Sequence, residues 1–171
     1  MSYRAAVITC SDRASNDVYE DRSGPIIRRA LTELGFEVTA PVIVPDEAEV
    51  IATEIRLAVA DGARVVITTG GTGVGPRDVT VEATRSLLTY EVPGVAEAVR
   101  SLGSANTPLA WLSRGLAGVI IQDENRAFVF NAPGSRGGAR DALSVLAPLL
   151  THIVSQLDGA DHDLNRPPSQ G

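Results

Sequence analysis

Short apolar runs alternate with amphipathic stretches along most of the chain. Runs over 5–10, 36–44 and 64–67 are rich in β-branched residues and predict buried strands. The stretches between them repeat apolar residues every three or four positions, as in helices that bury one face. Gly35 and Gly62 follow these stretches and mark helix ends. This order of elements predicts parallel strand pairing in a three-layer α/β/α fold, with a mostly parallel sheet and helices on both faces.

Three polar residues stand where they could cap helices. Ser23 precedes Pro25, a pair that predicts a helix start with Ser23 as its cap. Asp46 precedes an amphipathic run, so the local pattern favours a cap there as well. Asp78 stands in the same way before a helical pattern over 79–88. Capping is therefore the first interpretation of these three side chains.

The pattern loosens in the second half of the chain. The expected elements are a helix over 95–102, strands over 118–121 and 127–130 with a turn at 122–126, and a final helix over 142–157. From residue 158 the composition turns polar. We expect a single domain over 1–160 and a disordered tail over 161–171.

A glycine-rich loop follows the strand at 64–67. Residues 68–75 read Thr-Thr-Gly-Gly-Thr-Gly-Val-Gly, and 76–80 read Pro-Arg-Asp-Val-Thr. Unobstructed backbone amides before a helix form an anion site, to which the hydroxyls of Thr69 and Thr72 would add donors. A carboxylate there, Asp78, repels phosphate unless a cation such as Mg²⁺ compensates.

Other glycine-loop families fit this segment poorly. The loop lacks the lysine of a nucleotide-binding P-loop, and a proline stands where the dinucleotide fingerprint needs glycine. The remaining alternative from the residues alone is a tight turn without a ligand.

Composition narrows the function classes. The chain has 171 residues, 44% hydrophobic content and a net charge of −6, without a basic run, which argues against nucleic-acid binding. No segment has the length of a membrane span, and the start of the chain has no apolar leader, so a cytoplasmic location is expected. The single cysteine, Cys10, suits a reducing compartment and is interpreted as a core residue. Cations in the predicted loops are Arg22, Arg77, Arg114 and Arg136.

The chain resembles the Mog/MoaB molybdenum-cofactor biosynthesis family, whose relatives include the G domains of gephyrin and of the plant Cnx proteins. The glycine loop with its Pro-Arg-Asp-Val-Thr ending carries the resemblance. Four shorter segments match in the same order, at 11–15, 21–25, 44–47 and 131–135. The match spans residues 5–157.

The resemblance implies that ATP and molybdopterin are substrates, that an adenylyl group is transferred to molybdopterin with release of pyrophosphate, and that Mg²⁺ is the cofactor. It implies that Asp46 and Asp78 are catalytic and associated with the metal, a role that the same residue can combine with capping a helix. It also implies substrate and nucleotide contacts from Ser11, Asp12, Asp21, Ser23, Gly70, Gly71, Thr72, Gly73, Ser113, Arg114, Pro133, Gly134 and Ser135. From the residues alone, Asp21 and the 131–135 segment also suit plain turns.

The resemblance further implies a homotrimer. Trp111 lies in an apolar segment over 109–112 and is expected in the core or at a subunit interface. Whether the product passes directly to a molybdenum-insertion protein stays open. Two alternatives remain: a MoaB-type protein that binds or carries molybdopterin without catalysis, and a structural oligomer that uses the fold as a scaffold.

Overall fold

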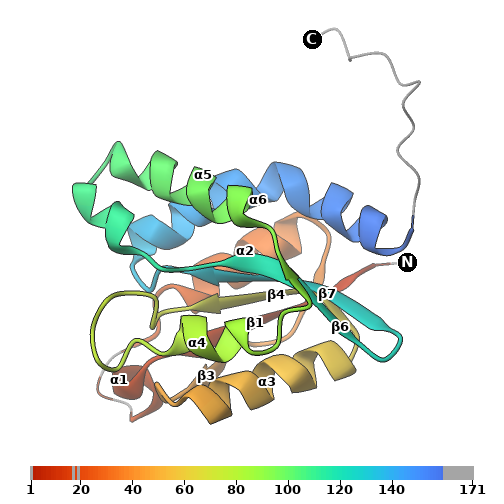
Figure 1. Cartoon of the computed structure of the whole chain (residues 1–171), viewed down its shortest axis with the longest axis horizontal. Coiled ribbons are helices and arrows are strands. Elements are labelled where there is room, and N and C mark those ends of the chain that lie inside the picture. The colour runs from red at the N-terminus through yellow and green to blue at the C-terminus, as the bar shows by residue number, and fades with distance from the viewer. Residues whose placement is uncertain (1, 17, 19, 160–171) are drawn as a thin grey trace, which may run out of the picture.

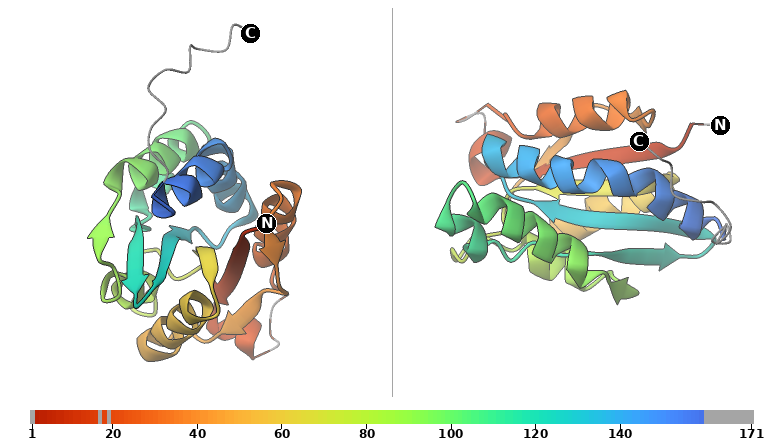
Figure 2. Two further views of the ribbon diagram at one scale, coloured as in Figure 1. Left: turned by 90° about the vertical axis from the view of Figure 1, so that its right-hand side faces the viewer. Right: turned by 90° about the horizontal axis from the view of Figure 1, so that it is seen from above.

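A twisted sheet between two layers of helices forms the body of the protein (Figures 1 and 2). The computed structural model describes residues 2–16, 18 and 20–159, so the expected tail over 161–171 lies outside the described residues. The strands are β1 (Arg4–Cys10), β2 (Glu37–Val38), β3 (Val42–Val44), β4 (Ala63–Thr69), β5 (Tyr90–Glu91), β6 (Ala117–Gln122) and β7 (Asn125–Ala132). They form one sheet in the order β2-β1-β4-β7-β6-β5, with β3 also paired to β1.

Most strand pairs are parallel. Strand β1 pairs in parallel with β2, β3 and β4, and β4 pairs in parallel with β7. The β6–β7 hairpin and the short β5 add antiparallel pairs at the other edge. The predicted mostly parallel sheet is therefore confirmed, and the carboxyl ends of β1, β3, β4 and β7 share one edge.

Helices cover both faces of this sheet. They are α1 (Asp12–Ser15), α2 (Gly24–Glu33), α3 (Ala48–Ala60), α4 (Thr80–Arg85), α5 (Pro93–Ser104) and α6 (Arg136–Leu157), with a 3-10 turn η1 (Pro108–Leu112). Helices α2, α5 and α6 lie on one face, and α3 and α4 on the other (Figure 1). Because strand side chains alternate, Val65 and Ile67 join the first core and Val66 joins the second. The three-layer prediction is confirmed.

Two sequence predictions about elements need correction. The single strand expected over 36–44 is divided into β2 and β3, with Pro41 between them. Proline has no N–H to donate to a ladder, so the pairing with β1 is interrupted there. The helix expected over 79–88 ends at Arg85, and the chain then enters β5, whose two exposed residues carry no recognisable strand pattern.

Candidate functional site

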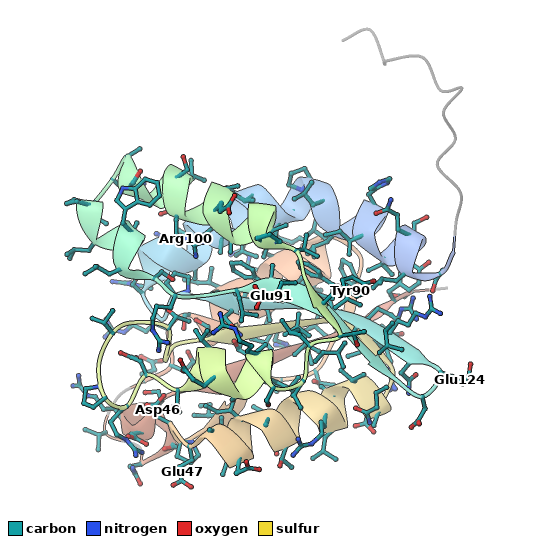
Figure 3. All side chains as sticks on the ribbon, viewed as in Figure 1. Asp46, Glu47, Tyr90, Glu91, Arg100 and Glu124 are labelled. Atoms are coloured by element: carbon teal, nitrogen blue, oxygen red, sulfur yellow. The ribbon has the colours of Figure 1, made fainter. Side chains whose placement is uncertain are left out.

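The loops that follow β1, β3, β4 and β7 enclose a small pocket of about 210 Å³ at the carboxyl edge of the sheet. Parallel strands bring these loops together although they are far apart in sequence. Figure 3 shows Asp46 at this end of the sheet and Glu124, in the β6–β7 turn, at the opposite end. The predicted site residues that line the pocket are Ser11, Asp21, Ser23, Asp46, Gly70, Gly71 and Gly134.

Asp12 and Asp46 join two of these loops by reciprocal hydrogen bonds. The Asp12 amide donates to Asp46 Oδ2 at 2.9 Å, and the Asp46 amide donates to Asp12 Oδ1 at 3.0 Å. Arg77 of the glycine loop donates two further bonds to the Asp12 carboxylate, at 2.9 and 3.0 Å. This guanidinium lowers the pKa of Asp12. Asp12 therefore connects the loops after β1, β3 and β4, while Ser11 beside it caps α1.

Asp46 is not a helix cap. Helix α3 begins at Ala48 after Glu47, and no side chain caps it. Asp46 Oδ1 is buried and has no hydrogen-bond partner among the described residues. Burial raises the pKa of Asp46, and the charges of Asp12 and Asp78 also raise it, against the lowering effects of the hydrogen bond from the Asp12 amide and of the Arg77 charge. The carboxylate is thus held in place through one oxygen, and its other oxygen remains available.

Asp78 is also not a cap, because the helix after it, α4, has no side-chain cap. Its carboxylate turns back onto the glycine loop, where Oδ2 accepts a hydrogen bond from the Gly75 amide at 2.8 Å. A β-carbon on Gly73 would lie 2.9 Å from Asp78 Oδ2, and one on Gly75 would lie 2.8 Å from it. The carboxylate position therefore requires glycine at both places.

Four consecutive amides of the loop, those of residues 71–74, have no acceptor among the described residues. Gly70 donates its amide to Ala132 O at 3.1 Å, which attaches the loop to the end of β7. Gly70 and Gly71 have φ values of 95° and 63°, which favour glycine. Within the described part of the chain, the amides of residues 71–74, Thr72 and Gly73 among them, donate to no other group. These N–H groups are free for a bound anion.

Arg114 braces the same loop. Its Nε donates to Gly73 O at 2.6 Å and its Nη2 to Asp78 O at 2.7 Å, and its amide donates to Thr72 O at 2.8 Å. The guanidinium also forms an ion pair with the Glu82 carboxylate. The residue predicted to contact substrate is therefore engaged in holding the glycine loop.

The cap hydrogen bond at the start of α2 comes from Asp21 and not from the Ser23 side chain. Asp21 Oδ1 accepts from the amides of Ser23 and Gly24 at 3.1 and 3.0 Å, so Asp21 caps α2. Its Oδ2 accepts from the buried Thr9 hydroxyl at 2.7 Å. Ser23 occupies the predicted N-cap position of α2, but its side chain makes no cap hydrogen bond.

The remaining predicted residues border a second pocket, of about 380 Å³, between α5, η1 and the start of α6. Ser113, Pro133 and Ser135 line it. Ser135 caps α6 by accepting from the Gly138 amide at 3.0 Å. The Thr69 hydroxyl, expected to face an anion, instead donates to Pro133 O at 2.9 Å. Gly134 separates the two pockets, and a β-carbon there would lie 3.1 Å from Gly70 Cα.

The comparison with known sequences matches most of this chain to a family. Residues 6–152 match the family described as a probable molybdopterin binding domain. The chain belongs to the Mog/MoaB molybdenum-cofactor biosynthesis family. The resemblance stated from the motifs is thereby confirmed.

Individual relatives of this Mog/MoaB chain differ in length. It is 42% identical to a molybdenum cofactor biosynthesis bifunctional protein of Synechococcus elongatus, over 92% of this chain and 48% of that protein. The chain thus spans about half the length of that relative. It is 37% identical to molybdenum cofactor biosynthesis protein B of Staphylococcus aureus, over 90% of this chain and 91% of the relative.

Solved structures agree with this membership. The molybdopterin biosynthesis Mog protein of Mycobacterium ulcerans superposes with a TM-score of 0.85 at 36% identity, covering 93% of this chain and 99% of that one. The tungsten cofactor synthesizing protein MoaB of Pyrococcus furiosus gives a TM-score of 0.85 at 32% identity, covering 91% and 96%.

Sequence reasoning missed several residues that shape the site of this Mog/MoaB protein. Arg100 Nη1 donates to Ser113 O at 3.3 Å and to Gly115 O at 3.0 Å. These bonds hold the segment before β6, beside the second pocket. Thr80 is fully buried behind Gly71. Arg100 is indistinguishable by pattern from other charged helix residues. Thr80 lies inside the Pro-Arg-Asp-Val-Thr segment, which was the available signal.

Arg114→Lys is expected to weaken the glycine loop. Lysine lacks the planar fork that reaches two carbonyls and a carboxylate at once. We expect faster amide hydrogen exchange over residues 70–79 and a loss of activity of about tenfold or more, since small displacements in such sites are costly. Arg56→Lys, on an exposed face of α3, is the control. Unchanged exchange in the loop would contradict the bracing role.

The Glu82–Arg114 pair predicts a small acid dependence of stability. The guanidinium lowers the pKa of Glu82 in the folded state. The pair therefore contributes stability above the ordinary Glu pKa, and this is lost as pH falls through the lower folded value. Because the Glu82 side chain is 51% exposed, Glu82→Gln should cost less than about 1 kcal/mol near neutral pH. Urea midpoints of both proteins should converge in acid; a constant difference would argue against this assignment.

Proposed function

We propose that this protein transfers the adenylyl group of ATP to molybdopterin. The observation that carries the proposal is the pairing of two carboxylates, Asp46 and Asp78, with free loop amides at one sheet edge. Asp46 offers an unpartnered buried oxygen at the pocket, and Asp78 lies close enough to raise the pKa of Asp46. Family membership in molybdenum-cofactor biosynthesis supports the same substrate class.

The residues present fit a magnesium ion. In the part of the chain that the structure describes, no cluster of three or more His, Cys, Asp or Glu side chains is arranged to hold a metal. Mg²⁺ is usually bound by one or two carboxylates together with waters and substrate phosphates. Asp46 and Asp78 would hold it, with the unpartnered Asp46 Oδ1 as a ligand. Bound there, it would neutralise charge on the phosphates.

The chain itself would orient two anionic substrates. The Thr72 and Gly73 amides would bind the terminal phosphate of molybdopterin, which is already ionised and needs no base. One of its oxygens would bond to the α-phosphorus of ATP as the α–β bridge breaks and pyrophosphate leaves with the bridging electron pair. Asp12, held by Arg77, fixes Asp46 during this exchange. Catalysis would consist of positioning and charge stabilisation.

The test is pyrophosphate release from ATP with and without molybdopterin, in Mg²⁺ or in EDTA. We expect release only when ATP, molybdopterin and Mg²⁺ are all present. A dephosphorylated pterin lacks the nucleophile and should give none. Molybdopterin binding without pyrophosphate release would favour the carrier alternative.

We also propose that the chain assembles as a trimer through η1. Leu109, Trp111 and Leu112 of this turn are 69%, 58% and 52% exposed, so the core alternative for Trp111 is wrong in the isolated chain. Three large apolar side chains on one short turn suit a contact repeated around a threefold axis. No helix in the described residues has the length and apolar content to span a membrane.

Light scattering should give a mass near three times 17.9 kDa. Leu112→Glu should shift the mass toward the monomer, because it places a charge in the contact. Leu57→Glu is a matched control, since Leu57 on α3 is also 52% exposed. A monomeric wild type at micromolar concentration would reject the trimer, and dissociation by the control alone would reject the interface.

A further inference from the structure

Two buried oxygens without hydrogen-bond partners lie close to Gly71. Among the described residues, the buried side-chain polar atoms without a partner are Asp46 Oδ1, Thr80 Oγ1 and Arg64 Nε. Arg64 lies at the start of β4, at the far end of the strand from the pocket. A buried polar group without a partner is costly, and in a native structure it calls for an explanation.

Both oxygens lie close to the point that a Gly71 β-carbon would occupy. Thr80 Oγ1 lies 2.2 Å from that point and Asp46 Oδ1 lies 3.1 Å from it. Any side chain at residue 71 would separate the hydroxyl from the carboxylate. Gly71 thus leaves a passage between a hydrogen-bond donor behind the loop and an acceptor that lines the pocket.

The backbone of Thr80 is fixed on both sides of this contact. Its amide donates to Gly71 O at 3.2 Å, and its carbonyl accepts from the Thr84 hydroxyl at 2.8 Å. Asn131 Nδ2 donates to Thr84 Oγ1 and to Thr68 Oγ1, both at 2.8 Å, which anchors this turn of α4 to β7 and β4. The Thr80 side chain is the part that is left to turn, and the nearby Cys10 thiol is only a weak competing partner.

We propose that Thr80 is a positioning residue, whose hydroxyl donates a hydrogen bond to Asp46 Oδ1 past Gly71 and so holds the carboxylate in its working orientation. This inference rests on the proposed function for its catalytic consequence. With Oδ2 held by the Asp12 amide and Oδ1 by Thr80, the carboxylate plane is fixed from both sides.

The proposal separates two conservative substitutions. Thr80→Val keeps the shape of the buried side chain but removes the donor, whereas Thr80→Ser keeps the donor and loses a methyl group. We expect Thr80→Val to lower kcat about tenfold, with KM for ATP and for molybdopterin nearly unchanged. Thr80→Ser should keep kcat within about threefold of the wild type, because it keeps the donor. If Thr80 acted only by packing, the lost methyl group of serine should lower kcat instead.

A double-mutant cycle with Asp46→Asn decides whether Thr80 acts through Asp46. In the Asp46→Asn background, Thr80→Val should change kcat less than about twofold. The same four proteins are compared by urea unfolding, where the shifts of the two single variants should fail to add. This second measurement needs no turnover, so it tests the pair even if the wild type releases no pyrophosphate.

Wild-type kcat in a folded Thr80→Val protein, together with additive urea shifts, would overturn the proposal. A folded Thr80→Ser protein with a kcat as low as that of Thr80→Val would also overturn it. Coupling in urea without pyrophosphate release in the wild type would support the contact and reject the adenylyl transfer.

Discussion

Replacing Asp46 or Asp78 by asparagine is expected to reduce pyrophosphate release by about 100-fold or more, the size of the loss when one transition-state electrostatic contact is removed. Asparagine keeps an oxygen that can accept from the Asp12 amide at residue 46 or from the Gly75 amide at residue 78. The loops should therefore stay in place. What is removed is the negative charge that would hold Mg²⁺ between the protein and the phosphates.

Steady-state pyrophosphate release, with urea unfolding of each variant alongside, measures this effect. Asp61→Asn is the control, because Asp61 is an exposed carboxylate at the end of α3, away from the pocket. Wild-type turnover by Asp78→Asn would exclude Asp78 from the chemistry. If Asp46→Asn lost stability but kept its rate, Asp46 would be a structural link between loops and not a metal ligand.

Gly73→Val is expected to abolish measurable binding of molybdopterin while the protein remains folded. Two effects act together. A β-carbon at residue 73 would lie 2.9 Å from Asp78 Oδ2, so the carboxylate must move. A branched side chain would also block the approach of a phosphate to the adjacent amides. The structure therefore links pterin binding and the position of Asp78 at one glycine.

Calorimetric titration with molybdopterin measures the loss, and circular dichroism checks that the variant is folded. Gly94→Val serves as the control, since a β-carbon on Gly94, in the first turn of α5, meets no atom within 4 Å. Unchanged pterin affinity in Gly73→Val would place the substrate elsewhere, and the pocket beside Ser113 and Pro133 would then be the next candidate.

Much of the fold could be predicted from local pattern, because burial imposes a period on each element. The apolar runs before Cys10 and Thr69 became β1 and β4, and the helical repeats ending near Gly35 and Gly62 became α2 and α3. Elements too short to show a period were lost, as β5 shows. The division between β2 and β3 was also missed, although Pro41 marks it in the sequence, because the apolar run continues across the proline.

The functional region was predictable for a different reason. Parallel strands place the loops at their carboxyl ends together, so Ser11, Asp46, Gly71 and Gly134 line one pocket, whereas Pro133 and Ser135 line the second. The individual partners of the polar groups were not predictable. Arg77 binds Asp12 across 65 positions, and Arg114 binds the carbonyl of Gly73 across 41. Contacts of such long range follow from the packing of whole elements.

The sequence by itself determined the family, the layered fold and the set of loops that form the candidate site. These follow from hydrophobic period, glycine positions and ordered motifs, which are local properties of the chain. Only the tertiary structure decided that Asp21 caps α2, that Asp78 folds back over Gly73 and Gly75, and that Asp46 keeps one oxygen free beside Thr80. An aspartate looks the same in the sequence whether it caps a helix, bridges two loops or binds a cation. Its role depends on which groups the folded chain brings within hydrogen-bond distance.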